Sequence, residues 1–134
     1  MRKNGFTMIE VMVVVLIVGV LTILAMATFI GNVREGRRSD GLNALLAMSL
    51  AEERYRTINT TYGSLAQVWG GVTASTQGYY TLAISSTSAT GYTLTATANG
   101  DQANDVSGST SCTTLTLTAS NGTITETPAA CWPQ

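Results

Sequence analysis

An acidic residue, Glu10, lies close to the start of a long apolar stretch, in the segment KNGFTMIEV. An ionisable side chain near the start of a membrane helix is costly, so it indicates a function and a partner of opposite charge. If the chain were cut after Gly5, Phe6 would become its first residue, and the new α-amine would lie about 6 Å along a helix from Glu10. This spacing therefore indicates an ion pair at one end of an apolar helix.

The only two cysteines, Cys112 and Cys131, both lie late in the chain. The chain contains no histidine, so metal ligation is disfavoured, and a disulfide formed in an oxidising compartment is the better interpretation. Closing a loop of that size would stabilise a small domain by about 3 kcal/mol on the chain-entropy model. Two free buried thiols in a cytosolic head are the alternative.

The sequence offers little else for chemistry. It has no Gly-rich phosphate loop, no carboxylate cluster at metal-ligand spacing and no nucleophile with a plausible base. Asp101 and Asp105 could hold a weak Ca²⁺ site with main-chain carbonyls, but two acids in a polar loop are more often solvated. We therefore expect no enzyme activity, no cofactor and no metal site.

The apolar residues are concentrated near the N-terminus. From Phe6 to Ile30, every residue is apolar or small except Thr7, Glu10, Thr22 and Thr28. At about 1.5 Å per helical residue, this run exceeds the roughly 30 Å of a bilayer's hydrocarbon core, so it is expected to span a membrane. A secretory signal peptide is the alternative, with only a weak cleavage site at Ala25-Met26-Ala27.

The orientation of this span is not decided by its flanking charges. Arg2 and Lys3 precede it, and Arg34, Arg37 and Arg38 follow it closely, so the positive-inside rule is near a tie. The expected disulfide breaks the tie because it requires an oxidising compartment. We therefore expect the C-terminal head outside the cytoplasm.

The segment from Asn32 to about Ile58 keeps a helical period. One apolar face comprises Ala44, Ala47, Met48, Ala51, Tyr55 and Ile58, and it is expected to pack on the head. A second row, formed by Leu42, Leu46 and Leu50 at steps of four, lies on a different side of the helix. Either the head buries both faces, or the leucine row contacts another copy of the protein.

Beyond this helix the sequence predicts strands. Thr or Ser alternates with Leu, Ile or Ala in residues 79–85, 92–98, 113–119 and 123–125. Asn121-Gly122 is a strong hairpin turn signal between the last two. The expected fold is therefore α+β: a long N-terminal helix packed on a four-stranded antiparallel meander that has one apolar face.

The segment from Arg2 to Glu10 resembles the prepilin signature of type IV pilins and pseudopilins. It has a short basic leader, then Gly5, then Phe6-Thr7, and Glu10 at the start of the apolar helix. The resemblance continues over essentially all of the chain as a helix, a four-stranded sheet and a late cysteine pair ending in Cys-Trp. The small size of the chain resembles that of minor pilins.

This resemblance implies processing and assembly. A membrane aspartyl prepilin peptidase would cut between Gly5 and Phe6 and methylate the Phe6 amine. Subunits would then leave the bacterial inner membrane and join an extracellular helical filament. Glu10 would pair with the Phe6 amine of a neighbouring subunit, or else with the amine of its own chain. We expect the assembly residues to be Phe6, Glu10, Leu42, Leu46 and Leu50.

The expected organisation has four parts. These are a cleaved basic leader (1–5), a transmembrane and filament-core helix (6–31), an amphipathic helix (32–58) and a β head with a disulfide-closed C-terminal region (59–134). The expected partners are other pilin subunits, the inner membrane before assembly, prepilin peptidase and the pilus assembly machinery.

Several functions are compatible with this organisation. The leading hypothesis is a structural subunit of a type IV pilus, most like a minor pilin, that supports pilus biogenesis, twitching motility, adhesion or DNA uptake. The alternatives are a major pilin, a type II secretion pseudopilin and a DNA-binding pilus receptor. Direct DNA binding is disfavoured because no Lys or Arg follows Arg56. The helix arginines are expected to pair with acids such as Glu35 and Asp40, either within the helix or between subunits.

Overall fold

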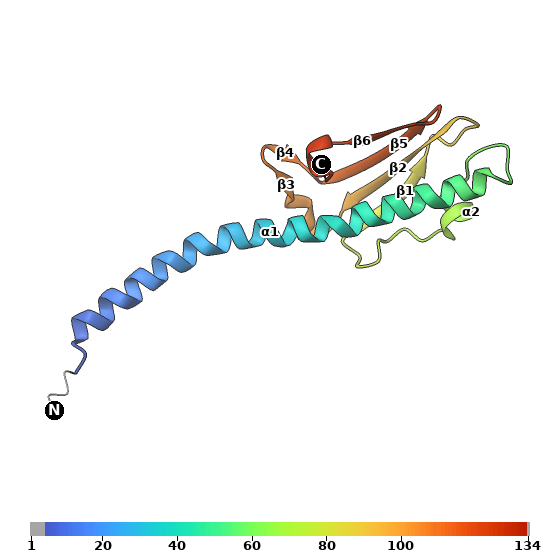
Figure 1. The fold of residues 1–134 in the computed structure, drawn as a ribbon. Helices are drawn as coiled ribbons and strands as arrows, with labels where there is room; N and C mark the ends of the chain where they lie inside the picture. The colour runs from blue at the N-terminus through green and yellow to red at the C-terminus, as the bar shows by residue number, and fades with distance from the viewer. Residues whose placement is uncertain (1–4, 134) are drawn as a thin grey trace. The chain divides into compact units, whose positions relative to one another are not determined.

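The computed structural model describes residues 5–133, and most of the expected leader lies outside this range. A single helix, α1 (Met8–Arg56), is followed by a short helix, α2 (Leu65–Trp69), and then by the strands of the head (Figure 1). The chain divides after Val33 into two compact units, which we describe separately.

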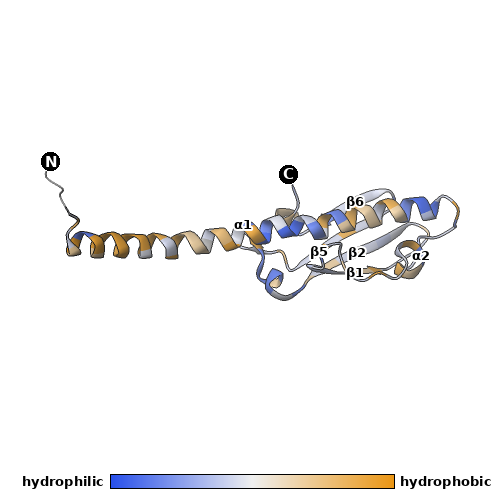
Figure 2. Cartoon of the chain, turned by 90° about the horizontal axis from the view of Figure 1, so that it is seen from below, coloured by the Kyte–Doolittle hydropathy of each residue, from blue (hydrophilic) through white to orange (hydrophobic). Residues whose placement is uncertain are grey.

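The first unit contains the apolar part of α1, which Figure 2 shows as predominantly hydrophobic. Thr7 precedes the helix, and the Glu10 N–H donates to both its carbonyl and its hydroxyl oxygen, so Thr7 acts as the N-cap. Every described side chain from residue 6 to residue 32 is exposed, including Ile9 (71%) and Phe29 (68%). By length and composition, α1 could cross a membrane.

The second unit is built on a four-stranded antiparallel sheet in the order β1-β2-β5-β6. Its strands are β1 (Tyr80–Ser85), β2 (Gly91–Ala98), β5 (Thr114–Ser120) and β6 (Thr123–Thr127). Between β2 and β5 lie a 3-10 turn, η1 (Gly100–Asn104), and a small hairpin of β3 (Val106–Ser107) and β4 (Thr110–Ser111). A second 3-10 turn, η2 (Ala129–Cys131), follows β6. The expected α+β fold is confirmed.

Alternation along the strands builds the core. The inward side chains of β1, β2 and β5 are buried together with one face of α1. The buried strand residues are Tyr80, Leu82, Tyr92, Leu94, Ala96, Ala98, Leu115, Leu117 and Ala119. Gly41 on α1 allows the Tyr80 ring to approach closely, since an added Cβ would lie 2.9 Å from ring atoms. This core fixes residues 34–56 of α1 on the sheet.

The predicted buried face of α1 was partly wrong. Ala47 is exposed, Ile58 is 84% exposed beyond the end of the helix, and Leu45, which was not assigned to that face, is fully buried. The centre of the buried face also includes Ser49 and Glu52. Because these two residues are polar, the apolar pattern alone placed the face too far around the helix.

The predicted strands and turn are confirmed, with small shifts at the strand ends. Asn121 and Gly122 have φ values of 49° and 80° and join Ser120 to Thr123, as expected for a tight hairpin turn. The sheet is not apolar on one face throughout, since all five residues of β6 are exposed. β6 is therefore an open, polar edge strand.

Substitution of Gly91 by Ala should destabilise the head by about 1–3 kcal/mol, because an added Cβ would collide with the Ala119 carbonyl oxygen in the paired strand. Chemical denaturation of the full-length chain in detergent, followed by tryptophan fluorescence, measures this change. Gly36→Ala is the control, since its Cβ would meet open space on an exposed helix position, and it should stabilise by about 0.5–1 kcal/mol. Equal effects of the two substitutions would contradict this account of the β2–β5 pairing.

Candidate assembly surface and the contacts that support it

Four of the five residues expected to direct assembly lie on exposed surfaces of α1 and the segment before it, and the fifth, Leu42, is half-buried. Phe6 is 78% exposed, and Glu10 lies in the first turn of the helix, where a negative charge is favoured by the helix dipole. No side-chain contact is recorded for Glu10 among residues 5–133. Its pairing with a Phe6 amine therefore stays a prediction.

The predicted leucine row does not form one uniform surface. Leu42 is half-buried against the core of the head, whereas Leu46 and Leu50 are 50% and 54% exposed. The head thus buries only part of the row. The two exposed leucines remain available for contact with another molecule.

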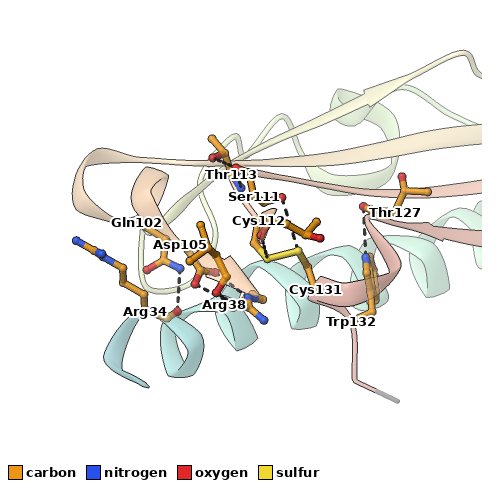
Figure 3. Close-up of a disulfide and its surroundings, with 12 residues drawn as sticks. Arg34, Arg38, Gln102, Asp105, Ser111, Cys112, Thr113, Thr127, Cys131 and Trp132 are labelled. Atoms are coloured by element: carbon orange, nitrogen blue, oxygen red, sulfur yellow. Dashed lines mark hydrogen bonds and ion pairs between the residues drawn. A yellow bond between two sulfur atoms is a disulfide. The ribbon is translucent and has the colours of Figure 1, made fainter. Parts of the chain in front are cut away.

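The expected disulfide is confirmed. Cys112 and Cys131 are bonded, with a sulfur–sulfur distance of 2.04 Å, and both side chains are buried (Figure 3). The bond joins the segment after β4 to η2 and so holds the C-terminal residues beside the β3–β4 hairpin. The adjacent Trp132 is also buried, and its indole N–H donates to the Thr127 carbonyl.

Two arginine–aspartate pairs fasten the β2–β5 connection to α1. Arg34 makes two hydrogen bonds to Asp101, at 2.7 and 3.1 Å, and Arg38 makes two to Asp105, at 2.7 and 2.9 Å. The first pair is exposed to solvent, whereas the second is buried. The amide of Gln102 donates to the Arg34 carbonyl and the Tyr80 hydroxyl, so η1 is also bonded between the two pairs (Figure 3).

These pairs correct two expectations. Asp105 is buried rather than solvated, and the arginines that follow the span pair with the head rather than with Glu35 or Asp40. The side chain of Asp40 instead accepts hydrogen bonds from the segment before β1. One signal was present in the sequence, because Arg34 and Arg38 are spaced by four residues and so are the two aspartates that they bind.

Hydrogen bonding within each arginine–aspartate pair shifts pKa values in the direction that keeps the charges. The hydrogen bonds from Arg34 hold the pKa of Asp101 below its usual value, and the nearby positive charges of Arg34 and Arg37 act in the same direction. The pKa of Arg38 is raised, chiefly by its hydrogen bonds to Asp105. Both arginines therefore remain protonated, and the carboxylates of Asp101 and Asp105 balance their positive charges.

A buried carboxylate, Glu52, lies near the end of α1. One of its oxygens accepts the Gly63 N–H at 2.9 Å, and the other has no hydrogen-bond partner among residues 5–133. Burial raises the pKa of Glu52; the Gly63 hydrogen bond opposes this shift, and the charge of Glu53 adds to it. No sequence pattern indicated that Glu52 would be buried, since acids are seldom fully buried without a charged partner.

Within residues 5–133, no three His, Cys, Asp or Glu side chains form a cluster that could hold a metal ion. The arrangement instead combines an exposed apolar helical segment with a head that is closed by a disulfide and bonded to residues 34–38 of α1 by ion pairs. These are features of an assembling subunit.

Comparison with known proteins identifies the family. One family model matches residues 27–116, which is more than half of the chain. Its description is "Type IV minor pilin ComP, DNA uptake sequence receptor". This chain belongs to that minor pilin family. A second model, described as a prokaryotic N-terminal methylation motif, matches residues 1–26. The predicted resemblance to type IV pilins is confirmed.

Among curated proteins, the chain is similar to type II secretion system core protein G from several bacteria. It is 33% identical over 66 residues to the Pectobacterium carotovorum protein, covering 49% of this chain and 42% of that protein. The Klebsiella pneumoniae protein is 35% identical over 66 residues, covering 49% and 47%. The chain thus spans less than half the length of these curated relatives.

The methylation motif and the exposed apolar helix fit the localisation of this family. The precursor is an inner-membrane protein, and the assembled subunit belongs to an extracellular pilus; among residues 5–133, α1 is the one helix long and apolar enough to cross a membrane. The minor pilin family is structural, which is consistent with the scarcity of catalytic groups in the sequence.

Substitution of Asp105 by Asn should lower the free energy of unfolding by about 3 kcal/mol, because it leaves the buried Arg38 charge without a counter-ion. The matched control is Asp101→Asn, which weakens an ion pair of the same bidentate form in solvent and should have a small effect. Denaturant titration of the full-length chain in detergent measures both. A larger loss from the Asp101 variant would contradict this ranking.

Glu52 should make the stability of the head decrease as pH rises above about 4.5, the usual pKa of a glutamate. Its pKa is higher in the folded than in the unfolded chain, so the folded state binds the proton more tightly and loses that advantage on deprotonation. Glu52→Gln should remove this slope and stabilise the head by about 1 kcal/mol at pH 8. Thermal unfolding at several pH values measures it. The control Glu53→Gln should keep most of the slope, because the Glu53 charge is the smallest of the causes of the shift, and a slope unchanged in Glu52→Gln would refute the assignment.

Proposed function

We propose that this minor pilin is cut between Gly5 and Phe6 and then assembles into a type IV pilus through its apolar helix. The observation that carries the proposal is that the helix beginning at the processing motif has every described side chain exposed up to residue 32. Such a surface cannot remain in water, so outside the bilayer the helices must bury one another. The filament core then replaces the lipid.

Glu10 sets the axial register of this assembly in our proposal. A charged carboxylate inside an apolar core is strongly penalised unless a cation neutralises it. The free amine created at Phe6 by cleavage, on a neighbouring subunit, supplies that cation. The exposure of both residues and the lack of a recorded contact to the Glu10 side chain within residues 5–133 are consistent with an intermolecular pair.

A pseudopilus subunit is the second candidate. The similarity to type II secretion system core protein G favours it, although this similarity covers only about half of the chain. Assembly through the apolar helix would be the same in both systems. The location of the processed protein, in surface filaments or only in the cell envelope, separates the two candidates.

DNA uptake is part of the description of this family. In this chain, direct phosphate contact by the head has little support, because the head contains no Lys or Arg after Arg56. The carboxylates of Asp101 and Asp105 also neutralise Arg34 and Arg38. We therefore propose a structural role in the filament rather than direct recognition of DNA.

Glu10→Ala should insert into the membrane and be cut after Gly5, but its amount in sheared filaments should fall at least tenfold because the register-setting ion pair is lost. Quantitative immunoblotting of membrane and filament fractions measures both steps. Thr22→Ala is the control, since the Thr22 hydroxyl bonds only the Val18 carbonyl of its own helix. Normal incorporation of the Glu10 variant would exclude the register role.

A further inference from the structure

A groove runs between α1 and the C-terminal residues of the head. It consists of two adjoining cavities of about 340 and 220 Å³, which share Ser39, Leu42, Trp132 and Pro133 in their linings. Leu46 also lines the smaller cavity. Figure 3 shows how the disulfide holds Cys131, next to Trp132, close to α1. The groove therefore has apolar side chains on both sides and a covalently fixed wall.

The rim of this groove carries two carboxylates, Glu35 and Glu126, that have no hydrogen-bond or ion-pair partner among residues 5–133, although Glu35 lies close enough to Arg38 for their charges to interact. Within residues 34–133, the other acidic side chains all accept hydrogen bonds, whereas Glu35 and Glu126 accept none and form no ion pair. Both are exposed, Glu35 at the larger cavity and Glu126 at the smaller one. The groove is thus suited to an apolar group that carries a positive charge and would repel an anion.

The same chain presents such a group on the exposed face of α1. Leu50 is 54% exposed, and Arg54, one helical turn further along, is also exposed. Arg54 is the arginine in residues 34–133 whose side chain has no recorded hydrogen bond, ion pair or ring contact; its carbonyl accepts a hydrogen bond from Thr57. An unpaired cation therefore follows an exposed leucine on the surface of the helix.

We propose that the Leu50–Arg54 face of one copy docks into this groove of a second copy, with Arg54 paired to Glu126 and Leu50 against Leu42 and Trp132. Leu50 lies eight residues after Leu42, so two parallel helices would be offset by about 12 Å along their axes. The two contacting surfaces are different, so the contact is heterologous and can repeat from copy to copy.

This contact rests on the proposed function. It specifies which surfaces of neighbouring subunits are in contact outside the apolar core of the filament. Charge complementarity favours a second copy of the chain as the partner that binds in the groove. Glu35 and Glu126 line the groove, and Arg54 lies on the exposed face of α1. A repeated offset in one direction is what a helical filament requires.

Site-specific photo-crosslinking of the full-length chain in cells tests the contact. A benzophenone amino acid replaces Leu50 in one tagged copy, a second copy carries a different tag, and mass spectrometry maps the adduct. We expect an adduct between the two copies at the segment containing Trp132. Glu126→Arg or Arg54→Glu should each reduce its yield at least fivefold, and the two substitutions together should restore it to more than half.

Thr123→Arg is the control, since it places the same side chain on the same exposed strand, with a charge change of one unit rather than two, at a position that does not line the groove. It should leave the adduct unchanged. An adduct to another protein, no adduct between copies, or no recovery in the double variant would each overturn the proposed contact. Loss in the Thr123 variant as well would also overturn it, because a general charge effect would then explain the result.

The filament and membrane fractions of the same cells separate the two proposals. Processed protein in filaments without an adduct between copies would leave the proposed function intact and refute the contact. If the protein is absent from filaments, the proposed function fails, and the adduct is then scored in the membrane fraction. An adduct there supports the contact, and its absence there refutes it.

Discussion

The exposure of the apolar part of α1 is the constraint on which the rest of the structure depends. From residue 6 to residue 32, every described side chain is exposed, so this segment has no core of its own to enter. It requires lipid or other apolar helices around it. Within that surface, Glu10 is an acid that an apolar environment tolerates only with a cation beside it. In the proposed assembly, the apolar surface drives association and Glu10 specifies its geometry.

The head must stay folded on the second part of α1 in either environment. The disulfide between Cys112 and Cys131 closes its C-terminal region, and the buried pair of Arg38 and Asp105 fastens the β2–β5 connection to the helix. Together they hold the walls of the groove in place. The aspartates that pair with Arg34 and Arg38 also neutralise charges that would otherwise be available for nucleic acid, so these ion pairs restrict what the head can bind. Glu52 differs from these paired residues because it is a buried acid without a charged partner.

Local patterns predicted much of this architecture. The prepilin-like segment, the period of two in the strands and the Asn121-Gly122 turn each depend on neighbouring residues, so the sequence alone was sufficient. The buried face of α1 was misplaced because Ser49 and Glu52 bury polar atoms there, which a hydrophobic pattern cannot anticipate. The pairing of Arg38 with Asp105 joins residues 67 positions apart, and only the folded chain brings them together. The roles of Glu10 and the exposed leucines involve other molecules and remain proposals.

The N-terminal peptide of the protein in sheared surface filaments tests the central claim most directly. Mass spectrometry should find a peptide that begins at Phe6, with a methylated α-amine, in the filament fraction. That result would place the processed apolar helix inside a pilus, where neighbouring helices replace the lipid. Processed protein confined to the cell envelope, with none in filaments, would contradict assembly into a pilus and favour a secretion pseudopilus. An uncut chain that begins before Gly5 would contradict the account of how the helix leaves the membrane.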